Sequence, residues 1–205
     1  MSDPSGAFSR SLQRLQTEYV DLYLLHCPFF TAATHGTDVP TVWRALESIH
    51  ASGNARNIGV SNFNAAQIRE LLGYAKVRPA VNQVEFHPYC CDTELLEVCA
   101  AEGITVAAYS PLAPVVRFKG GPLDEVVERV AGRCGKTVEQ VLMKWARQMG
   151  CVVVTTTSKE ERMRAFLEVE GEWSLTDEEV EEILSVGKTH HRRVFWRKQY
   201  GEADA

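Results

Sequence analysis

A run of hydroxyl and basic side chains near residue 160 has the chemistry of a phosphate-binding turn. Lys159 comes directly after four hydroxyl-bearing residues, which are Thr155, Thr156, Thr157 and Ser158, and Arg162 follows three positions later. The turn opens a helix, and the free amides and positive dipole end of a helix N-terminus favour an anion. Arginine adds a forked pair of N–H donors for phosphate oxygens. The pattern therefore indicates an anionic ligand at this turn.

The histidines and cysteines are interpreted without a metal centre. His190 and His191 have no carboxylate or cysteine at ligand spacing, so we predict no metal site. His87 precedes a proline and is interpreted as structural. Cys90 and Cys91 are interpreted as small apolar fillers. His26 ends an apolar run, a position where a lone histidine is usually structural.

Five short apolar runs predict the buried strands that must position these side chains. They cover residues 20–25, 57–60, 80–86, 104–109 and 151–155, and each is too short for a helix. The segment after each run returns to helical spacing. Four residue pairs predict capping boxes at helix starts, namely Asn64 with Gln67, Thr137 with Gln140, Ser158 with Glu161, and Thr176 with Glu179.

This alternation of strands and helices predicts an α/β fold with parallel strands joined by right-handed crossovers. An open doubly wound sheet and a β/α barrel both have this pattern. No Gly-x-Gly-x-x-Gly follows any predicted strand, which favours the barrel over a Rossmann nucleotide domain. The 205 residues suit a single domain over 1–205. A closed barrel has eight strands, so we expect strands to be absent at the N-terminus.

Four motifs occur in order at the ends of the predicted strands. They are Tyr-Val-Asp-Leu-Tyr-Leu-Leu-His-Cys-Pro at 19–28, Ile-Gly-Val-Ser-Asn-Phe at 58–63, Asn-Gln-Val-Glu-Phe-His-Pro-Tyr at 82–89 and Ala-Tyr-Ser-Pro-Leu at 108–112. Together they resemble the aldo-keto reductase family. The resemblance implies an incomplete (β/α)8 TIM barrel, comprising strands four to eight with their helices and the C-terminal tail. Barrel enzymes keep their sites at this end of the strands.

The resemblance also implies a cofactor site. Residues matching Ser61, Asn62 and Gln83 hydrogen-bond the nicotinamide carboxamide in that family, and Tyr109 matches the tyrosine that stacks on the ring. Ser110 and Leu112 match contacts near the pyrophosphate. Many members have Lys where Thr156 stands and Asn where Phe166 stands. Lys159 and the hydroxyls would still hold a 2′-phosphate, as in a fungal branch resembling conjugated polyketone reductases, so NADPH is predicted and NADH stays an alternative.

The implied reaction is the NADPH-dependent reduction of aldehydes or ketones to alcohols by hydride transfer. The family's proton-donating tyrosine and its lysine and aspartate lie on earlier strands, so we expect this chain to lack them. His26 matches the fourth catalytic position, which orients the carbonyl. We therefore predict little or no activity for this chain alone. The alternatives are a non-catalytic cofactor-binding or interaction protein, and an inert product of an incomplete coding sequence.

Composition limits the partners to small molecules and other protein chains. Lys and Arg total 22 against 27 Asp and Glu, a net charge of −5, which argues against nucleic acid. By resemblance, the basic and aromatic residues 190–200 form a tail in which Phe195 and Trp196 shape a substrate pocket. The apolar runs are too short to cross a membrane, and cysteines without Cys-x-x-Cys spacing indicate the cytoplasm. Unpaired sheet edges would invite self-association.

Overall fold

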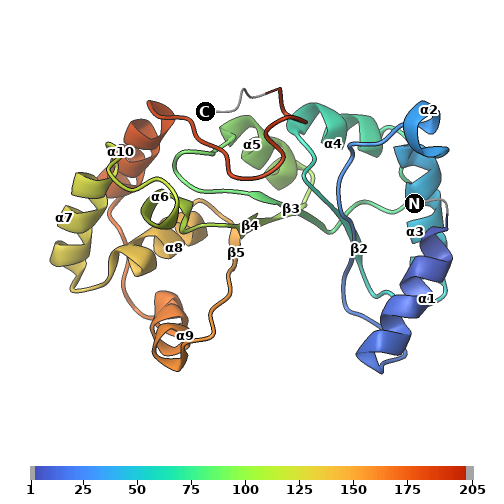
Figure 1. Cartoon of the computed structure of the whole chain (residues 1–205), viewed down its shortest axis with the longest axis horizontal. Helices are drawn as coiled ribbons and strands as arrows, with labels where there is room; N and C mark the ends of the chain where they lie inside the picture. Colours follow the sequence, from blue (N-terminus) through green and yellow to red (C-terminus); the bar gives the residue numbers. More distant parts are fainter. Residues whose placement is uncertain (1–2, 202–205) are drawn as a thin grey trace. The chain divides into compact units, whose positions relative to one another are not determined.

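The computed structural model describes residues 3–201 of the chain (Figure 1). The strands are β1 (Tyr23–Leu25), β2 (Ile58–Ser61), β3 (Val81–Glu85), β4 (Thr105–Tyr109) and β5 (Val152–Val154). The helices are α1 (Pro4–Leu15), α2 (Ala32–His35), α3 (Val39–Ala51), α4 (Ala65–Leu72), α5 (Thr93–Ala101), α6 (Ala113–Val116), α7 (Asp124–Cys134), α8 (Val138–Gln148), α9 (Glu160–Leu167), η1 (Glu168–Glu170) and α10 (Asp177–Lys188). Within these residues, no helix is both long and apolar enough to cross a membrane.

The α/β class is confirmed, and the five strands form one sheet in the order β1-β2-β3-β4-β5. The pairs β1/β2, β2/β3 and β4/β5 are parallel. Each predicted strand is present, with at least one end shifted, and β1 and β4 end at the predicted residues Leu25 and Tyr109. The largest difference is in β1, which begins at Tyr23, because Val20 forms only an isolated bridge with Ala55. The intervening Asp21 and Leu22 are exposed.

The chain divides into two compact units, which are described separately. The first unit contains Met1–Val84 and Glu94–Val106, and the second contains Glu85–Thr93 and Ala107–Ala205. The first unit therefore holds β1, β2 and most of β3, and the second holds most of β4 and all of β5. The single domain expected over 1–205 stays a prediction.

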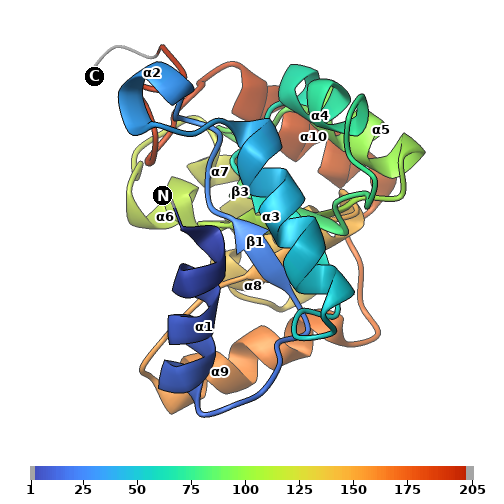
Figure 2. The ribbon, with the colours of Figure 1, turned by 90° about the vertical axis from the view of Figure 1, so that its right-hand side faces the viewer.

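In the first unit, α3 covers strands β1 and β2 with an apolar face. Figure 2 shows α3 lying alongside β1, and Trp43 of α3 is fully buried. The neighbouring strands approach so closely that a Cβ on Gly59 would lie 2.5 Å from the carbonyl oxygen of Val81. The register of β2 and β3 places Ser61 opposite Gln83, so two polar residues are neighbours at the ends of these strands.

In the second unit, α8 packs its aromatic face onto the segment that follows β3. The rings of Phe86 and Trp145 stack with their centroids 5.4 Å apart. Helix α10 lies against the turn after β3, where a Cβ on Gly187 would come within 2.3 Å of the Pro88 carbonyl oxygen. Because only glycine fits there, the last turn of α10 and this turn are held in direct contact.

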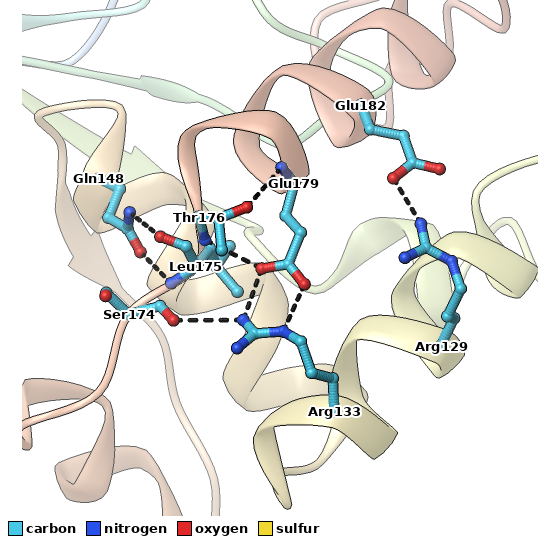
Figure 3. A network of polar contacts seen from close by, with 8 residues as sticks. All are labelled: Arg129, Arg133, Gln148, Ser174, Leu175, Thr176, Glu179 and Glu182. Atoms are coloured by element: carbon cyan, nitrogen blue, oxygen red, sulfur yellow. Dashed lines mark hydrogen bonds and ion pairs between the residues drawn. The ribbon is translucent and has the colours of Figure 1, made fainter.

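A polar network fixes the start of α10 in the second unit (Figure 3). The Glu179 carboxylate accepts hydrogen bonds from the Arg133 guanidinium on α7 and from the Thr176 amide. Arg133 also donates to the Ser174 carbonyl at 3.3 Å. The Gln148 side chain pairs with the backbone of Leu175, accepting at 2.8 Å and donating at 3.0 Å. The segment that enters α10 is thus tied to both α7 and α8.

Three of the four predicted capping boxes are confirmed, at Asn64, Thr137 and Thr176. The box predicted at Ser158 with Glu161 is wrong. The N-cap of α9 is Lys159, whose side chain makes no capping hydrogen bond. The Thr157 hydroxyl instead accepts from the Lys159 amide at 3.1 Å. Such local side-chain turns compete with capping for the same backbone groups.

Candidate functional site

In the first unit, the three residues predicted to hold a carboxamide lie together and are joined by hydrogen bonds. The Ser61 hydroxyl donates to the Gln83 carbonyl at 2.6 Å, and the Asn62 amide nitrogen Nδ2 donates to the Ser61 hydroxyl at 3.0 Å. The Asn62 backbone amide donates to the same Gln83 carbonyl at 2.9 Å. Ser61 and Asn62 are buried. The structure therefore brings these three residues together at the ends of β2 and β3.

A tight turn after β2 makes this arrangement possible. Asn62 has φ of 63°, in the left-handed region that asparagine tolerates better than most residues. Asn82, fully buried in β3, donates from Nδ2 to the Phe63 carbonyl at 2.9 Å and accepts from the Phe63 amide at 3.5 Å. We did not predict this role from the sequence. An asparagine inside an apolar strand is the signal, because a buried amide must find partners.

His26 follows β1 in the same unit and is exposed. Its carbonyl accepts a hydrogen bond from Asn62 Nδ2 at 2.9 Å, which ties the end of β1 to the cluster. The residue lines a cavity of about 410 Å³ together with Tyr23, Cys27 and residues of α1 and α3. Burial raises the pKa of the Tyr23 phenol, so Tyr23 is a poor proton donor. His26 therefore lines a cavity of the first unit.

The second unit contains a groove of about 470 Å³ at the ends of β4 and β5. Seven residues predicted to contact cofactor or substrate line it, namely Tyr109, Ser110, Leu112, Thr156, Thr157, Arg162 and Phe195. Ser158, Lys159 and Trp196 are not among its lining residues. Helix α9 explains the difference, because it begins at Glu160, and Arg162 lies in its first turn.

The groove combines apolar walls with hydroxyls and one cation. Tyr109 packs edge-to-face against Phe195, with ring centroids 5.7 Å apart and an interplanar angle of 73°. Exposed Arg162 and the hydroxyls of Thr156 and Thr157 supply donors for an anion. Burial, with a smaller contribution from Glu85, raises the pKa of the Tyr109 phenol. The groove suits a ligand with a flat apolar part and an anionic part.

Glu85, His87 and Cys90 form a buried cluster in the second unit, with potential ligand atoms within 4.8 Å of one another. The Glu85 carboxylate accepts from His87 Nε2 at 3.0 Å and from the amides of Val194 and Phe195 at 2.7 and 2.9 Å. We did not predict this cluster. A glutamate within an apolar strand was the available signal, because a buried carboxylate requires partners.

The sequence comparisons agree on one family. A model of the Aldo/keto reductase family matches residues 5–188. The chain is 37% identical over 195 residues to the NAD/NADP-dependent indole-3-acetaldehyde reductase of Schizosaccharomyces pombe, covering 93% of this chain and 67% of the relative. It is 35% identical over 210 residues to the NADPH-dependent alpha-keto amide reductase of Saccharomyces cerevisiae, covering 98% and 67%.

Solved structures show the same likeness. The aldo-keto reductase of Bombyx mori in complex with NADP matches with a TM-score of 0.88 and 30% identity, covering 98% of this chain and 68% of that one. A reductase from Brucella melitensis matches with a TM-score of 0.79 and 28% identity, covering 90% and 68%. The chain thus spans about two thirds of the length of these relatives.

Proposed function

Because the chain belongs to the aldo/keto reductase family, we propose that it binds NADPH and serves the reduction of aldehydes or ketones to alcohols. The groove of the second unit carries this proposal, since it combines the Tyr109 ring with Thr156, Thr157 and Arg162. An aromatic ring, hydroxyls and a guanidinium suit a phosphorylated dinucleotide. The names of the two yeast relatives, both reductases that use a nicotinamide dinucleotide, support it.

Each unit has its own proposed contacts. In the first unit, Ser61, Asn62 and Gln83 hold the carboxamide. In the second, Tyr109 stacks on the nicotinamide ring, and Ser110 and Leu112 contact the pyrophosphate. The 2′-phosphate is held by side chains near the start of α9, which are Thr156, Thr157, Ser158, Lys159 and Arg162. A positive charge at this position favours NADPH over NADH.

The bound cofactor would supply the hydride, and the residues of this chain would orient the substrate. His26 hydrogen-bonds the substrate carbonyl, and Phe195 and Trp196 shape the pocket around it. Burial raises the pKa of both Tyr23 and Tyr109, which makes each a weak proton donor. We therefore propose that the polypeptide of these 205 residues reduces carbonyls slowly or not at all by itself.

The fold proposal follows the same family. We propose that the five strands correspond to strands four to eight of a (β/α)8 barrel in a single domain. We also propose that the protein is cytoplasmic and has no nucleic-acid or membrane partner. The family model supports a single domain, because residues 5–188 draw on both units.

A second candidate is a binding or interaction protein without catalysis. Strands β1 and β5 are the outer strands of the sheet, and Val152 and Val154 of β5 are exposed. Unpaired apolar edges favour pairing with another chain, so we propose self-association. Sedimentation of the chain over a range of concentrations tests it, and a monomer at all concentrations would contradict it.

The main proposal is tested by titrating the chain with NADPH and following tryptophan fluorescence. Arg162→Ala should weaken binding about tenfold or more, because a charge-assisted hydrogen bond contributes about 1.5–3 kcal/mol. Arg164→Ala is the matched control, since Arg164 lies on the same helix, is exposed and is absent from the groove lining. Absence of saturable quenching by NADPH would refute the proposal.

Catalysis is measured separately, by NADPH consumption with reactive aldehydes and diketones. Turnover near the ~10 s⁻¹ that is typical of enzymes would contradict the proposed low activity of the isolated chain. Binding without turnover is the outcome that both this proposal and the non-catalytic alternative expect.

A further inference from the structure

We propose that Glu85 is a positioning residue that holds the C-terminal tail, so that Phe195 forms one wall of the groove in the second unit. The inference deepens the proposed function and rests on it, because it names a residue that controls how well this groove binds its ligand. Glu85 itself is not among the residues that line the groove.

The Glu85 carboxylate is fully buried and receives three N–H donors. Oε1 accepts from the Val194 amide at 2.7 Å and from His87 Nε2 at 3.0 Å, and Oε2 accepts from the Phe195 amide at 2.9 Å. The side chains of Glu85 and His87 have no exposed surface. A buried carboxylate is tolerated only with such partners, and its hydrogen bonds are stronger than those between neutral groups. Displacing the tail would therefore be costly.

The tail depends on contacts of this kind for its position. Residues 191–201 contain no helix or strand, so no repeating backbone hydrogen bonds hold them. Among the backbone contacts of this segment, the Arg192 amide donates to the Tyr89 carbonyl at 2.9 Å. The amides of Val194 and Phe195 are held by the carboxylate of Glu85, which lies more than a hundred positions earlier in the chain. Trp196 then has φ of 60°, a left-handed conformation that a non-glycine residue adopts only when its surroundings impose it.

This clamp sets the shape of the groove through Phe195. Val194 and Phe195 both line the groove, and the Phe195 ring lies edge-to-face against Tyr109. Phe195 is 46% exposed, so packing around its side chain does not by itself hold it in place. Burial is the main cause that raises the pKa of Tyr109, and the nearby Glu85 charge raises this pKa further. The groove wall and the clamp are thus linked through two consecutive backbone amides.

His87 completes the clamp by fixing the carboxylate from the other side. Burial lowers the pKa of His87, so the ring is neutral and carries one N–H. Within the described part of the chain, Nδ1 is buried without a hydrogen-bond partner, which assigns the proton to Nε2 facing Glu85. Three N–H donors already satisfy the Glu85 carboxylate, so we prefer the role of a clamp to that of a metal ligand.

The test compares Glu85→Gln with Glu128→Gln, a matched change at an exposed glutamate on α7. Glutamine has a single acceptor oxygen, so one tail amide loses its partner. The first measurement is limited trypsin digestion, which reads tail release at Arg192, Arg193, Arg197 and Lys198. The second is NADPH affinity by fluorescence titration. We expect E85Q to be cleaved about tenfold faster and to bind NADPH about tenfold more weakly, the loss expected for one charge-assisted bond.

Phe195→Ala tests the contribution of the Phe195 side chain to the groove separately from the hydrogen bonds of Glu85. It keeps Glu85 and both backbone amides, so its tail should resist trypsin like the wild type while NADPH binding weakens as in E85Q. This variant also keeps the inference testable if E85Q does not fold, which circular dichroism would reveal.

The inference is overturned if E85Q matches E128Q in both measurements, or if F195A binds NADPH as tightly as the wild type. A wild-type chain that does not bind NADPH would refute the proposed function instead. In that case the trypsin comparison would still decide whether Glu85 holds the tail.

Discussion

The Ser61 hydroxyl donates a hydrogen bond to the main-chain carbonyl of Gln83 at 2.6 Å, and this contact links the ends of two neighbouring parallel strands. The Ser61 hydroxyl proton is therefore used in a bond within the protein. The Ser61 oxygen already accepts from Asn62 Nδ2 at 3.0 Å, which leaves one of its two acceptor positions unused. The Gln83 side chain keeps both its donor and its acceptor groups. The polar cluster of the first unit is therefore a preformed arrangement that does not need a ligand to assemble it.

The turn at Asn62 should be sensitive to both backbone strain and lost hydrogen bonds. Asn62→Gly removes the side-chain bonds to His26 and Ser61 but relieves the left-handed backbone. Asn62→Ala removes the same bonds and keeps the strain. We expect N62A to be less stable than N62G by about 1 kcal/mol. Urea unfolding measures the difference, and equal midpoints would show that the backbone here is unconstrained.

Gly187 and Gly132 should respond in opposite directions to the same substitution. A Cβ on Gly187 would overlap the Pro88 backbone at 2.3 Å, whereas nothing lies within 4 Å of one on Gly132 in α7. We expect G187A to destabilise the chain by about 1–3 kcal/mol. G132A should stabilise it by about 0.5–1 kcal/mol, because alanine favours helix. Thermal melting of both variants checks the signs.

The pairing of Glu179 with Arg133 should make stability depend on acid pH. Burial pushes the pKa of Glu179 up, but the hydrogen bonds from Arg133 and from the Thr176 amide outweigh this effect and lower it. Its stabilisation is thus present above the unfolded-state pKa of about 4.3 and is lost as the pH falls through the lowered value. We expect the gap in urea midpoint between wild type and E179Q to narrow below about pH 4. E182Q, at a partly exposed glutamate that pairs with Arg129, is the control.

His87 should make stability depend on pH nearer neutrality. Burial lowers its pKa, and nearby Arg193 and His191 act in the same direction, whereas Glu85 opposes them. The unfolded chain then takes up a proton that the folded chain does not. Stability is fully present above the unfolded-state pKa of about 6.5 and falls as the pH drops below it. Unfolding midpoints between about pH 5 and 8 should decline less for H87Q than for H35Q, whose histidine is exposed. Equal declines would show that His87 titrates normally.

Most of the secondary structure could be predicted from the sequence, because the interactions that form it are local. Apolar runs located all five strands, and pairs three residues apart located the starts of α4, α8 and α10. The polar residues at the strand ends were also predicted. Ser61 and Gln83 meet because parallel strands align their carboxyl ends.

The tertiary structure alone decided which of the predicted site residues line the groove of the second unit. Ser158 and Lys159 do not line the groove, because α9 begins one residue later than the capping pattern indicated. The hydrogen-bond donors to the Glu85 carboxylate could not be predicted from the sequence either. Its acceptor oxygens meet the amides of Val194 and Phe195 across 109 and 110 residues. A periodic sequence pattern does not reveal a contact between residues so far apart in the chain. Such a contact depends on which donors lie near the buried carboxylate once the chain has packed.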